Sequence, residues 1–215
     1  ADLKRRRHDV SFCSGNSYEV RDMEKYDVII VGAGPAGIFT ALELYRRGCS
    51  KRILMVEKGK SVEKRSCPKA KTKKCVGCQP CNITTGFSGA GAFSDGKLSL
   101  SHEVGGDFPN LVGADFAQEL IDYTDKIYLE YGADTHVEGV SDPEKVRGIR
   151  KRAIRAGLKL VDCPIRHLGT EKAQALYLAI EQDLQAKGVE MLFSHSCVDL
   201  IMDGPSCRGV VIEPA

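Results

Sequence analysis

The sequence predicts an α/β fold built around a parallel sheet, and three observations carry this prediction. Residues 26–31 are a nearly continuous β-branched run, which is typical of a strand buried on both faces. A glycine turn and a helical stretch follow, and Gly48 is placed to end that helix. Residues 52–57 form a second apolar strand. Two strands joined through a helix make a βαβ unit, whose strands lie parallel.

The remaining elements follow from local patterns. Residues 1–25 have no clear period, so we expect a tail or the end of a missing N-terminal region. Residues 58–100 are rich in Lys, Cys, Gly and Ser, and an irregular stretch of this length is usually functional or disordered. Apolar periodicity, a capping box at 141–144 and Thr170 predict three helices, over 115–132, over 142–156 and from 170 to Gly188. Short strands are expected over 158–161, 189–193, 198–202 and 210–212.

Composition and charge exclude several classes of protein. The 215 residues are 42% hydrophobic and 28% charged, which are globular proportions. A net charge of +2 argues against nucleic-acid binding through bulk charge. The longest apolar stretch, Val28–Leu42, contains glycines and a proline and is shorter than the roughly 20 residues that span a bilayer. The first residues lack the apolar core of a signal peptide, so we expect a cytoplasmic protein without a membrane partner.

The turn after the first strand fits the pattern G-x-G-x-x-G over Gly32, Ala33, Gly34, Pro35, Ala36 and Gly37. It lies between a predicted strand and a predicted helix, which is the context that a dinucleotide-binding turn requires. Gly32 permits the tight turn, Gly34 lets the backbone approach a pyrophosphate, and Gly37 lets helix and strand pack closely. The helix N-terminus then offers free N–H groups and partial positive charge to the phosphates.

Glu57 ends the second strand, 20 residues after Gly37, and Lys58 follows it. A carboxylate at this place accepts hydrogen bonds from ribose hydroxyls and repels a 2′-phosphate. The alternative is a turn that merely connects strand and helix, with Glu57 solvated. Strand, turn, helix, strand and acid together favour a dinucleotide site, and we include Lys58 in it. The motif does not distinguish FAD from NAD.

Four of the nine cysteines are clustered, as Cys67, Cys75, Cys78 and Cys81. The C-x2-C-x2-C spacing lets sulfurs converge on one centre, which favours a [4Fe-4S] cluster. Cys67, which Pro68 follows, is either the fourth ligand or a free cysteine. Zinc also takes four thiolates, and a basic loop with unligated cysteines is the third alternative. Between Lys51 and Lys74 there are ten Lys or Arg against Glu57 and Glu63, and such cations would stabilise an anionic cluster.

A glycine-rich segment, Gly86–Leu98, follows the cysteines. Such a loop lets backbone N–H groups approach a flat ring or a phosphate, although a plain surface loop has the same composition. With this segment the chain resembles the FAD-dependent dehydrogenases related to glutathione-reductase-type flavoproteins. The resemblance rests on Y-D-V-I-I-V-G-A-G-P-A-G from Tyr26, the cysteine run from Cys75, G-A-G-A-F-S-D-G-K-L from Gly89, residues 165–170 and residues 188–190.

The resemblance implies FAD at the glycine turn and Glu57. It places the following residues near the pyrophosphate or the isoalloxazine ring: Ser88, Gly89, Ala90, Gly91, Ser94, Asp95, Gly96 and Lys97. Val198 would offer backbone groups to adenine. Such flavoproteins close the FAD site with a later strand ending in a Gly-Asp pair, which the chain lacks, so we expect a fragment of a larger flavoprotein. The FAD-binding domain would be 26–215, incomplete at its C-terminus, with a Cys-rich basic loop at 58–100 and a helical insertion at about 110–187.

The expected function is that of a FAD-dependent oxidoreductase acting on a small molecule or an electron carrier, with NAD(P)H considered as electron donor. An iron–sulfur centre would pass single electrons between flavin and carrier. His167 is the acid/base candidate, against a structural role, and Arg166 beside it is expected to face solvent. Two other functions stay open. One is a non-catalytic cysteine-rich module that binds a metal or a partner, and the other is a flavoenzyme acting on RNA.

Overall fold

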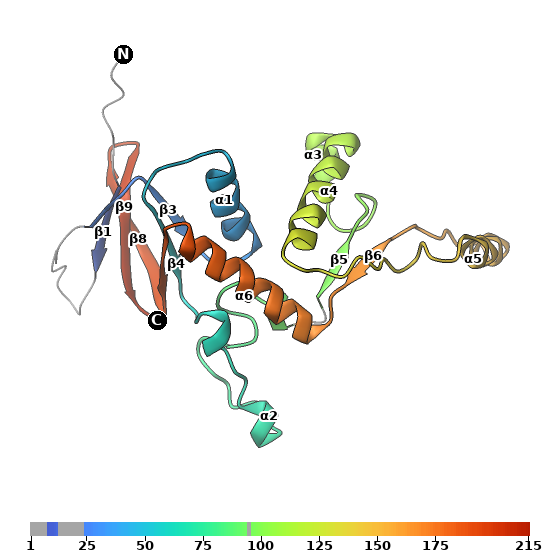
Figure 1. The fold of residues 1–215 in the computed structure, drawn as a ribbon, viewed down its shortest axis with the longest axis horizontal. Helices are drawn as coiled ribbons and strands as arrows, with labels where there is room; N and C mark the ends of the chain where they lie inside the picture. The colour runs from blue at the N-terminus through green and yellow to red at the C-terminus, as the bar shows by residue number, and fades with distance from the viewer. Residues whose placement is uncertain (1–7, 13–23, 94–95) are drawn as a thin grey trace, which may run out of the picture. The chain divides into compact units, whose positions relative to one another are not determined.

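The computed structural model of the chain describes residues 8–12, 24–93 and 96–215 (Figure 1). The chain falls into two compact units. The first comprises Ala1–Ala92 with Tyr177–Ala215, and the second comprises Phe93–Leu176. The second unit accounts for most of the predicted helical insertion.

A three-stranded parallel sheet forms the centre of the first unit. Its strands are β3 (Val28–Val31), β4 (Ile53–Glu57) and β7 (Val189–Phe193), in the order β3-β4-β7. The helix α1 (Pro35–Arg46) connects β3 to β4, and Gly48 follows its end with a φ of +75°. The predicted βαβ unit is therefore confirmed. Every residue of the central strand β4 is buried, as its unbroken apolar run predicts.

A second sheet has the order β2-β1-β9-β8. It comprises β1 (His8–Phe12), β2 (Glu24–Tyr26), β8 (His195–Asp203) and β9 (Ser206–Pro214). β8 and β9 contain the predicted strands 198–202 and 210–212 but pair antiparallel. β1 pairs in parallel with β9, so His8–Phe12 form a strand rather than a tail, while the alternative of the end of a missing N-terminal region stays a prediction. The paired residues are 200 positions apart, and a local period does not reveal such a pairing.

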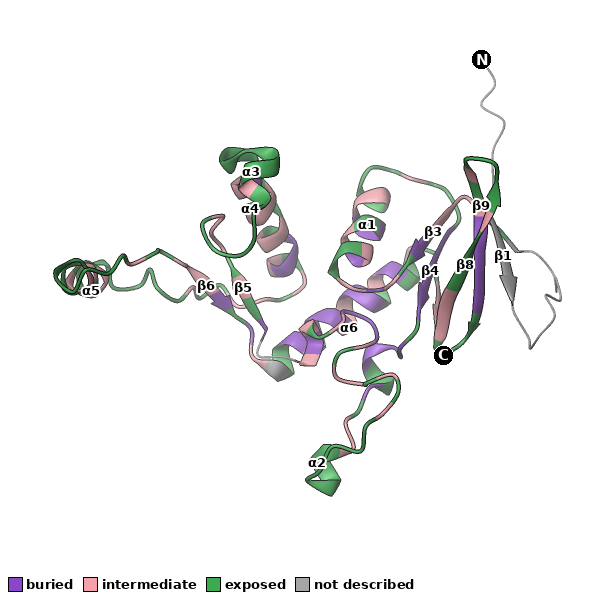
Figure 2. Ribbon diagram, turned by 180° about the vertical axis from the view of Figure 1, so that it is seen from behind, coloured by how far each residue is buried: buried purple, intermediate pink, exposed green. Residues whose placement is uncertain are grey.

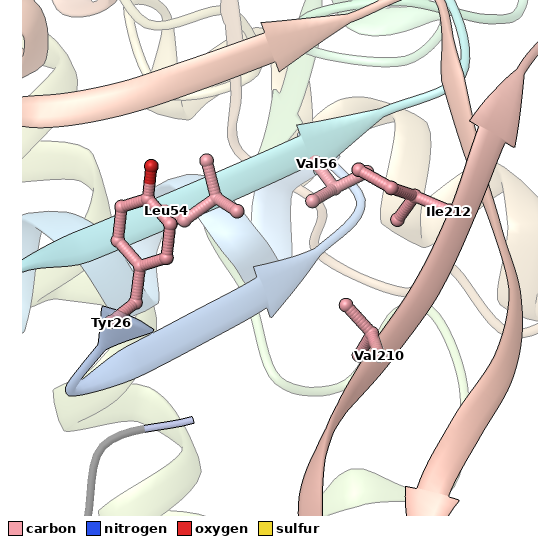
Figure 3. Packing of buried hydrophobic residues seen from close by; sticks show 5 residues of the cluster. All are labelled: Tyr26, Leu54, Val56, Val210 and Ile212. Carbon is pink, nitrogen blue, oxygen red and sulfur yellow. The ribbon is translucent and has the colours of Figure 1, made fainter. Parts of the chain in front are cut away.

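The core of the first unit lies between the two sheets (Figure 3). Leu54 and Val56 of β4 pack with Val210 and Ile212 of β9, and Tyr26 completes the cluster. Fully burying one such side chain contributes about 1.5–3 kcal/mol. Figure 2 shows the same concentration of buried residues along β4 and β9. This packing fixes β4, and with it the strand end where Glu57 lies.

The segment after β4 is mostly irregular, as predicted. Among its described residues, 58–93 and 96–100, the regular elements are the short η1 (Val62–Lys64), α2 (Lys69–Thr72), η2 (Gly91–Phe93) and the strand β5 (Lys97–Ser99). The helix α6 (Thr170–Ala186) precedes β7, in agreement with the predicted helix ending before Gly188. It presents Glu181 to the backbone of η1, where the carboxylate accepts a 2.9 Å hydrogen bond from the Val62 N–H.

The second unit contains α3 (Phe108–Val112), α4 (Ala114–Glu130) and α5 (Pro143–Arg155), and the strands β5 (Lys97–Ser99) and β6 (Ile165–His167) pair antiparallel. The predicted helices 115–132 and 142–156 are confirmed. The side chain of Asp142, rather than that of Ser141, caps α5 by accepting from the Lys145 N–H. Residues 158–161 form no strand: Leu158 and Val161 stay exposed, and no strand in the described part of the chain pairs with them.

Arg166 is buried rather than exposed to solvent. Its guanidinium binds both carboxylate oxygens of Asp125 on α4, at 2.6 and 2.7 Å. A buried arginine needs such a partner, so this pair holds β6 to α4 within the second unit. Within the described ranges, no helix combines the length and apolarity that crossing a bilayer requires.

The buried Glu181 makes the stability of the chain depend on pH. Glu181 is only 4% exposed. Burial raises the pKa of Glu181 and the nearby charge of Glu63 adds to this shift, whereas the Val62 hydrogen bond and Lys64 oppose it. The folded chain therefore binds this proton more tightly than the unfolded chain. The resulting stabilisation is present at low pH and is lost as the pH rises through the raised pKa.

We predict that Glu181→Gln becomes more stable relative to the wild type as the pH rises. Glutamine keeps an acceptor for the Val62 N–H but carries no charge to desolvate. Thermal unfolding of both proteins between about pH 5 and about pH 8 measures the difference in midpoint. A difference that stays constant over this range would show that Glu181 does not titrate differently on folding.

Candidate functional site

The glycine turn leads from the end of β3 into an uncapped helix N-terminus. Gly32 has a φ of +95°, and its N–H donates to the Val56 carbonyl at 2.7 Å. Gly34 is the N-cap residue of α1, and no side chain caps this end of the helix. The first helical hydrogen bond runs from the Ile38 N–H to the Gly34 carbonyl. The N–H groups of Ala36 and Gly37 therefore lie in the first turn, where a helix provides no acceptor.

Two glycines of the turn serve different purposes. A Cβ on Gly37 would lie 2.0 Å from the Gly32 carbonyl oxygen, so this glycine is required by the packing of α1 on the turn. A Cβ on Gly34 would meet no atom of the described residues within 4 Å, and its φ of −77° suits any residue. The protein itself thus has no need of glycine at position 34. The space in front of Gly34 is what a bound phosphate group would use.

Glu57 joins the end of β4 to this turn. Its Oε2 accepts from the Ala33 N–H and its Oε1 accepts from the Gly59 N–H, both at 2.8 Å. The residue is only 7% exposed, so the alternative of a solvated strand end is wrong. A carboxylate has about four lone-pair sites, and two backbone bonds leave acceptor capacity for a further donor. Lys58, the next residue, is exposed.

The glycine-rich segment reaches the turn through Ser88. The Ser88 N–H donates to the Ala33 carbonyl at 2.7 Å, and Ser88 is buried with a φ of +73°. Its hydroxyl accepts from the Ala92 N–H at 3.0 Å, and its carbonyl accepts from the Gly91 N–H. A non-glycine residue in the left-handed region is uncommon and persists only where its surroundings enforce it. The segment is therefore attached to the turn at this point rather than being a plain surface loop.

A buried arginine, which the sequence analysis did not single out, holds this segment. Arg65 is 4% exposed and donates to three carbonyls. Its Nε binds Asn82 O at 2.9 Å, its Nη1 binds Phe87 O at 2.6 Å and its Nη2 binds Ile83 O at 2.7 Å. Burial lowers the pKa of Arg65, and the charges of Glu57 and Cys81 oppose that shift. Arg65 is one of ten basic residues between 51 and 74, and no sequence signal separates it from the exposed ones.

The structure brings only part of the predicted set to this turn. Gly89, Ala90 and Gly91 continue the segment from Ser88 within the first unit, whereas Gly96 and Lys97 belong to the second unit. Ser94 and Asp95 lie outside the described residues. Within the second unit, Gly96 accepts from the Leu168 N–H and has no room for a Cβ beside that residue. The predicted cofactor contacts of all these residues of the glycine-rich segment stay predictions.

Two further predicted residues lie on strands. Val198 is exposed on β8, at a bulge where the pairing with β9 passes from Cys197 to Asp199. His167 is exposed and lies opposite Lys97 in the β5–β6 pair. Among the described residues its imidazole has no hydrogen bond or ion pair. The adenine contact of Val198 and the acid/base role of His167 therefore also stay predictions.

The four clustered cysteines do not form a metal site in this structure. All four are free thiols, and Cys75 and Cys81 are exposed. In the described part of the chain, no three His, Cys, Asp or Glu side chains gather closely enough to hold a metal ion. The predicted convergence on one centre is thus not supported. Instead, hydrogen bonds from the Ile83 and Thr84 backbone lower the pKa of Cys81, and Thr84's side chain and Arg65 contribute.

Comparison with known proteins agrees with the glycine turn. Residues 25–75 match the family model of an FAD binding domain. The chain is 39% identical over 101 residues to an uncharacterized protein of Clostridium beijerinckii, covering 42% of this chain and 18% of that protein. It is 42% identical over 55 residues to the mitochondrial electron transfer flavoprotein-ubiquinone oxidoreductase of Dictyostelium discoideum, covering 24% of this chain and 9% of that protein. The matches thus span less than a fifth of either relative's length.

Similar solved structures include a 3-ketosteroid-Δ4-(5α)-dehydrogenase from Rhodococcus jostii RHA1, with 13% identity and a TM-score of 0.48, covering 88% of this chain and 44% of that one. The L-amino acid deaminase from Proteus vulgaris has 17% identity and a TM-score of 0.43, covering 94% of this chain and 48% of that one. The family match spans β3, the glycine turn, α1 and β4. Together with the parallel sheet, it confirms the predicted α/β FAD/NAD(P)-binding fold.

We predict that Gly37→Ala destabilises the chain and that Gly34→Ala does not. The added methyl group at position 37 overlaps the Gly32 carbonyl, and such overpacking typically costs about 1–3 kcal/mol. At position 34 the same group meets only open space. Chemical denaturation of the three proteins measures the free energies of unfolding. Equal losses at the two positions would contradict this description of the turn.

Proposed function

We propose that the chain binds FAD at the glycine turn and contributes this site to a FAD-dependent oxidoreductase. One observation supports this most: the uncapped N-terminus of α1 lies beside a glycine that the protein's own packing does not need. Those residues fall within the stretch that matches an FAD binding domain. A helix N-terminus with free N–H groups and an open approach suits a pyrophosphate.

Each part of the proposed site has a separate task. The N–H groups of Ala36 and Gly37 would donate to phosphate oxygens, aided by the partial positive charge at the helix end. Gly34 would let the pyrophosphate come close to the backbone. Glu57 would use its remaining lone pairs for ribose hydroxyls, and its charge would disfavour a 2′-phosphate. The segment from Ser88 to Gly91, attached to Ala33, would line the same site.

FAD, when bound, supplies hydride and single-electron chemistry. The chain's described residues bind and orient the cofactor in this proposal, and no residue is assigned to the substrate. His167 stays the acid/base candidate from the sequence, and NAD(P)H stays the proposed electron donor. The cysteine-rich module, which was the first alternative, gives no reason for an open glycine at position 34. The RNA-directed alternative rests on the basic loop alone.

We predict that the chain takes up FAD and that Gly34→Ala weakens this binding by at least about tenfold, or about 1.4 kcal/mol. The added methyl group occupies the space proposed for the pyrophosphate, whereas the fold tolerates it. Equilibrium dialysis with absorbance of the bound flavin measures the affinity. Gly148→Ala on α5 is the matched control, because it adds the same methyl group outside the proposed site and meets only the Arg152 side chain, at 4.0 Å.

The bound flavin should also bleach when dithionite, NADH or NADPH reduces it. Bleaching of the bound flavin with dithionite but not with NADH or NADPH would remove NAD(P)H from the proposal. A chain that takes up no FAD under any of these conditions would contradict the proposed function. Equal affinity of the wild type and Gly34→Ala would contradict the placement of the pyrophosphate.

A metal at the cysteines is a separate question, and we propose that FAD binding does not require one. The hydrogen bonds that shape the turn come from Glu57, Val56 and Ser88, and none comes from a cysteine. We therefore predict that treatment with a chelator leaves the FAD affinity unchanged. A loss of affinity on chelation, together with iron and labile sulfide in the untreated protein, would restore the iron–sulfur hypothesis.

A further inference from the structure

The side chain of Arg65 connects two chain segments that both adjoin the proposed FAD site. Arg65 lies eight residues after Glu57, the last residue of β4. Its guanidinium binds the carbonyls of Asn82, Ile83 and Phe87. Three carbonyls spread over six positions of sequence are thereby drawn to one planar group. A guanidinium presents its donors in a fixed fork, so these bonds specify an orientation as well as a distance.

The two segments are also in direct backbone contact beside this arginine. Lys60 pairs with Gly86 as a parallel bridge, and the Phe87 N–H donates to the Lys60 carbonyl at 3.0 Å. A Cβ on Gly59 would lie 2.4 Å from the Gly86 nitrogen, and a Cβ on Gly86 would lie 2.7 Å from the Arg65 Cδ. The two backbones are in contact beside the Arg65 side chain, so neither glycine has room for a side chain.

The next residue along the chain transmits this arrangement to the glycine turn. Phe87 accepts from Arg65 through its carbonyl, and Ser88 donates through its N–H to Ala33. These two groups belong to the same peptide unit, which is planar. The position of the Arg65 guanidinium therefore constrains where the Ser88 N–H points, and with it how the glycine-rich segment lies on the turn.

We infer that Arg65 is a positioning residue of the flavin site, which sets the glycine-rich segment against the dinucleotide turn through the Phe87–Ser88 peptide. This inference rests on the proposed function, because it concerns the same site. Arg65 does not touch the proposed phosphate groups. It acts through the peptide that Ser88 shares with Phe87. A lysine at this position could not bind the same three carbonyls, because its ammonium lacks the fork geometry of a guanidinium.

The test compares Arg65→Met and Arg65→Lys with Lys64→Met in the 215-residue chain. Lys64 is exposed, so its variant removes the same charge one position away without removing a buried hydrogen bond. We expect the dissociation constant for FAD to rise by at least about tenfold in Arg65→Met, by less in Arg65→Lys, and to stay unchanged in Lys64→Met. The measurement is made well below each protein's unfolding midpoint, so that it reports on folded molecules.

A second readout separates positioning from general stability. Amide hydrogen exchange without FAD should become faster at Ser88 in both Arg65 variants, while Gly32, whose N–H donates to Val56, stays protected. If Arg65→Met does not fold, Arg65→Lys decides: a raised dissociation constant with faster Ser88 exchange supports the inference. Wild-type affinity in a folded Arg65 variant overturns it. A wild type that binds no FAD instead overturns the proposed function.

Discussion

The carboxylate of Glu57 is the constraint on which the candidate site depends. Its two oxygens accept from Ala33 and Gly59, so one side chain fixes both the glycine turn and the start of the loop after β4. A buried carboxylate is stable only when such donors replace its hydration. Removing it would leave the backbone N–H groups of Ala33 and Gly59 without these acceptors.

The strand that carries Glu57 is held by the packing of two sheets. β4 is buried along its whole length, between β3 and β7 in its own sheet and against β9 of the other. A displacement of β4 would therefore disturb the core before it moved the carboxylate. Rigid support of this kind suits a binding site, because a ligand then meets groups that are already in position.

The sequence predicted the parts of the site that depend on local patterns. The β-branched run, the glycine spacing and the acid after the second strand are local signals, and β3, α1, β4 and the buried Glu57 agree with them. The contacts that Arg65 and Ser88 make could not be predicted in this way, because they join segments about 20 to 55 residues apart. Neither a lysine-rich loop nor a glycine-rich loop shows which side chain is buried.

The errors have the same physical origin. Residues 8–12 form a strand because β9 supplies a partner, whereas residues 158–161 have no partner strand among the described residues. Arg166 was expected in solvent, and the carboxylate that buries it belongs to Asp125, 41 positions earlier. The cysteine spacing supplied residue types that can bind a metal but could not show whether the loop brings them together. Long-range pairing decides each of these cases.

The central claim is that phosphate groups of FAD bind the first-turn N–H groups of α1. The most direct measurement is the amide NMR spectrum of the isotope-labelled chain during titration with FAD. The account predicts large shifts for Gly34, Ala36 and Gly37, and smaller ones for Gly32 and Ala33, whose N–H groups already donate to Val56 and Glu57. Saturating FAD without a shift at Ala36 and Gly37 would contradict it.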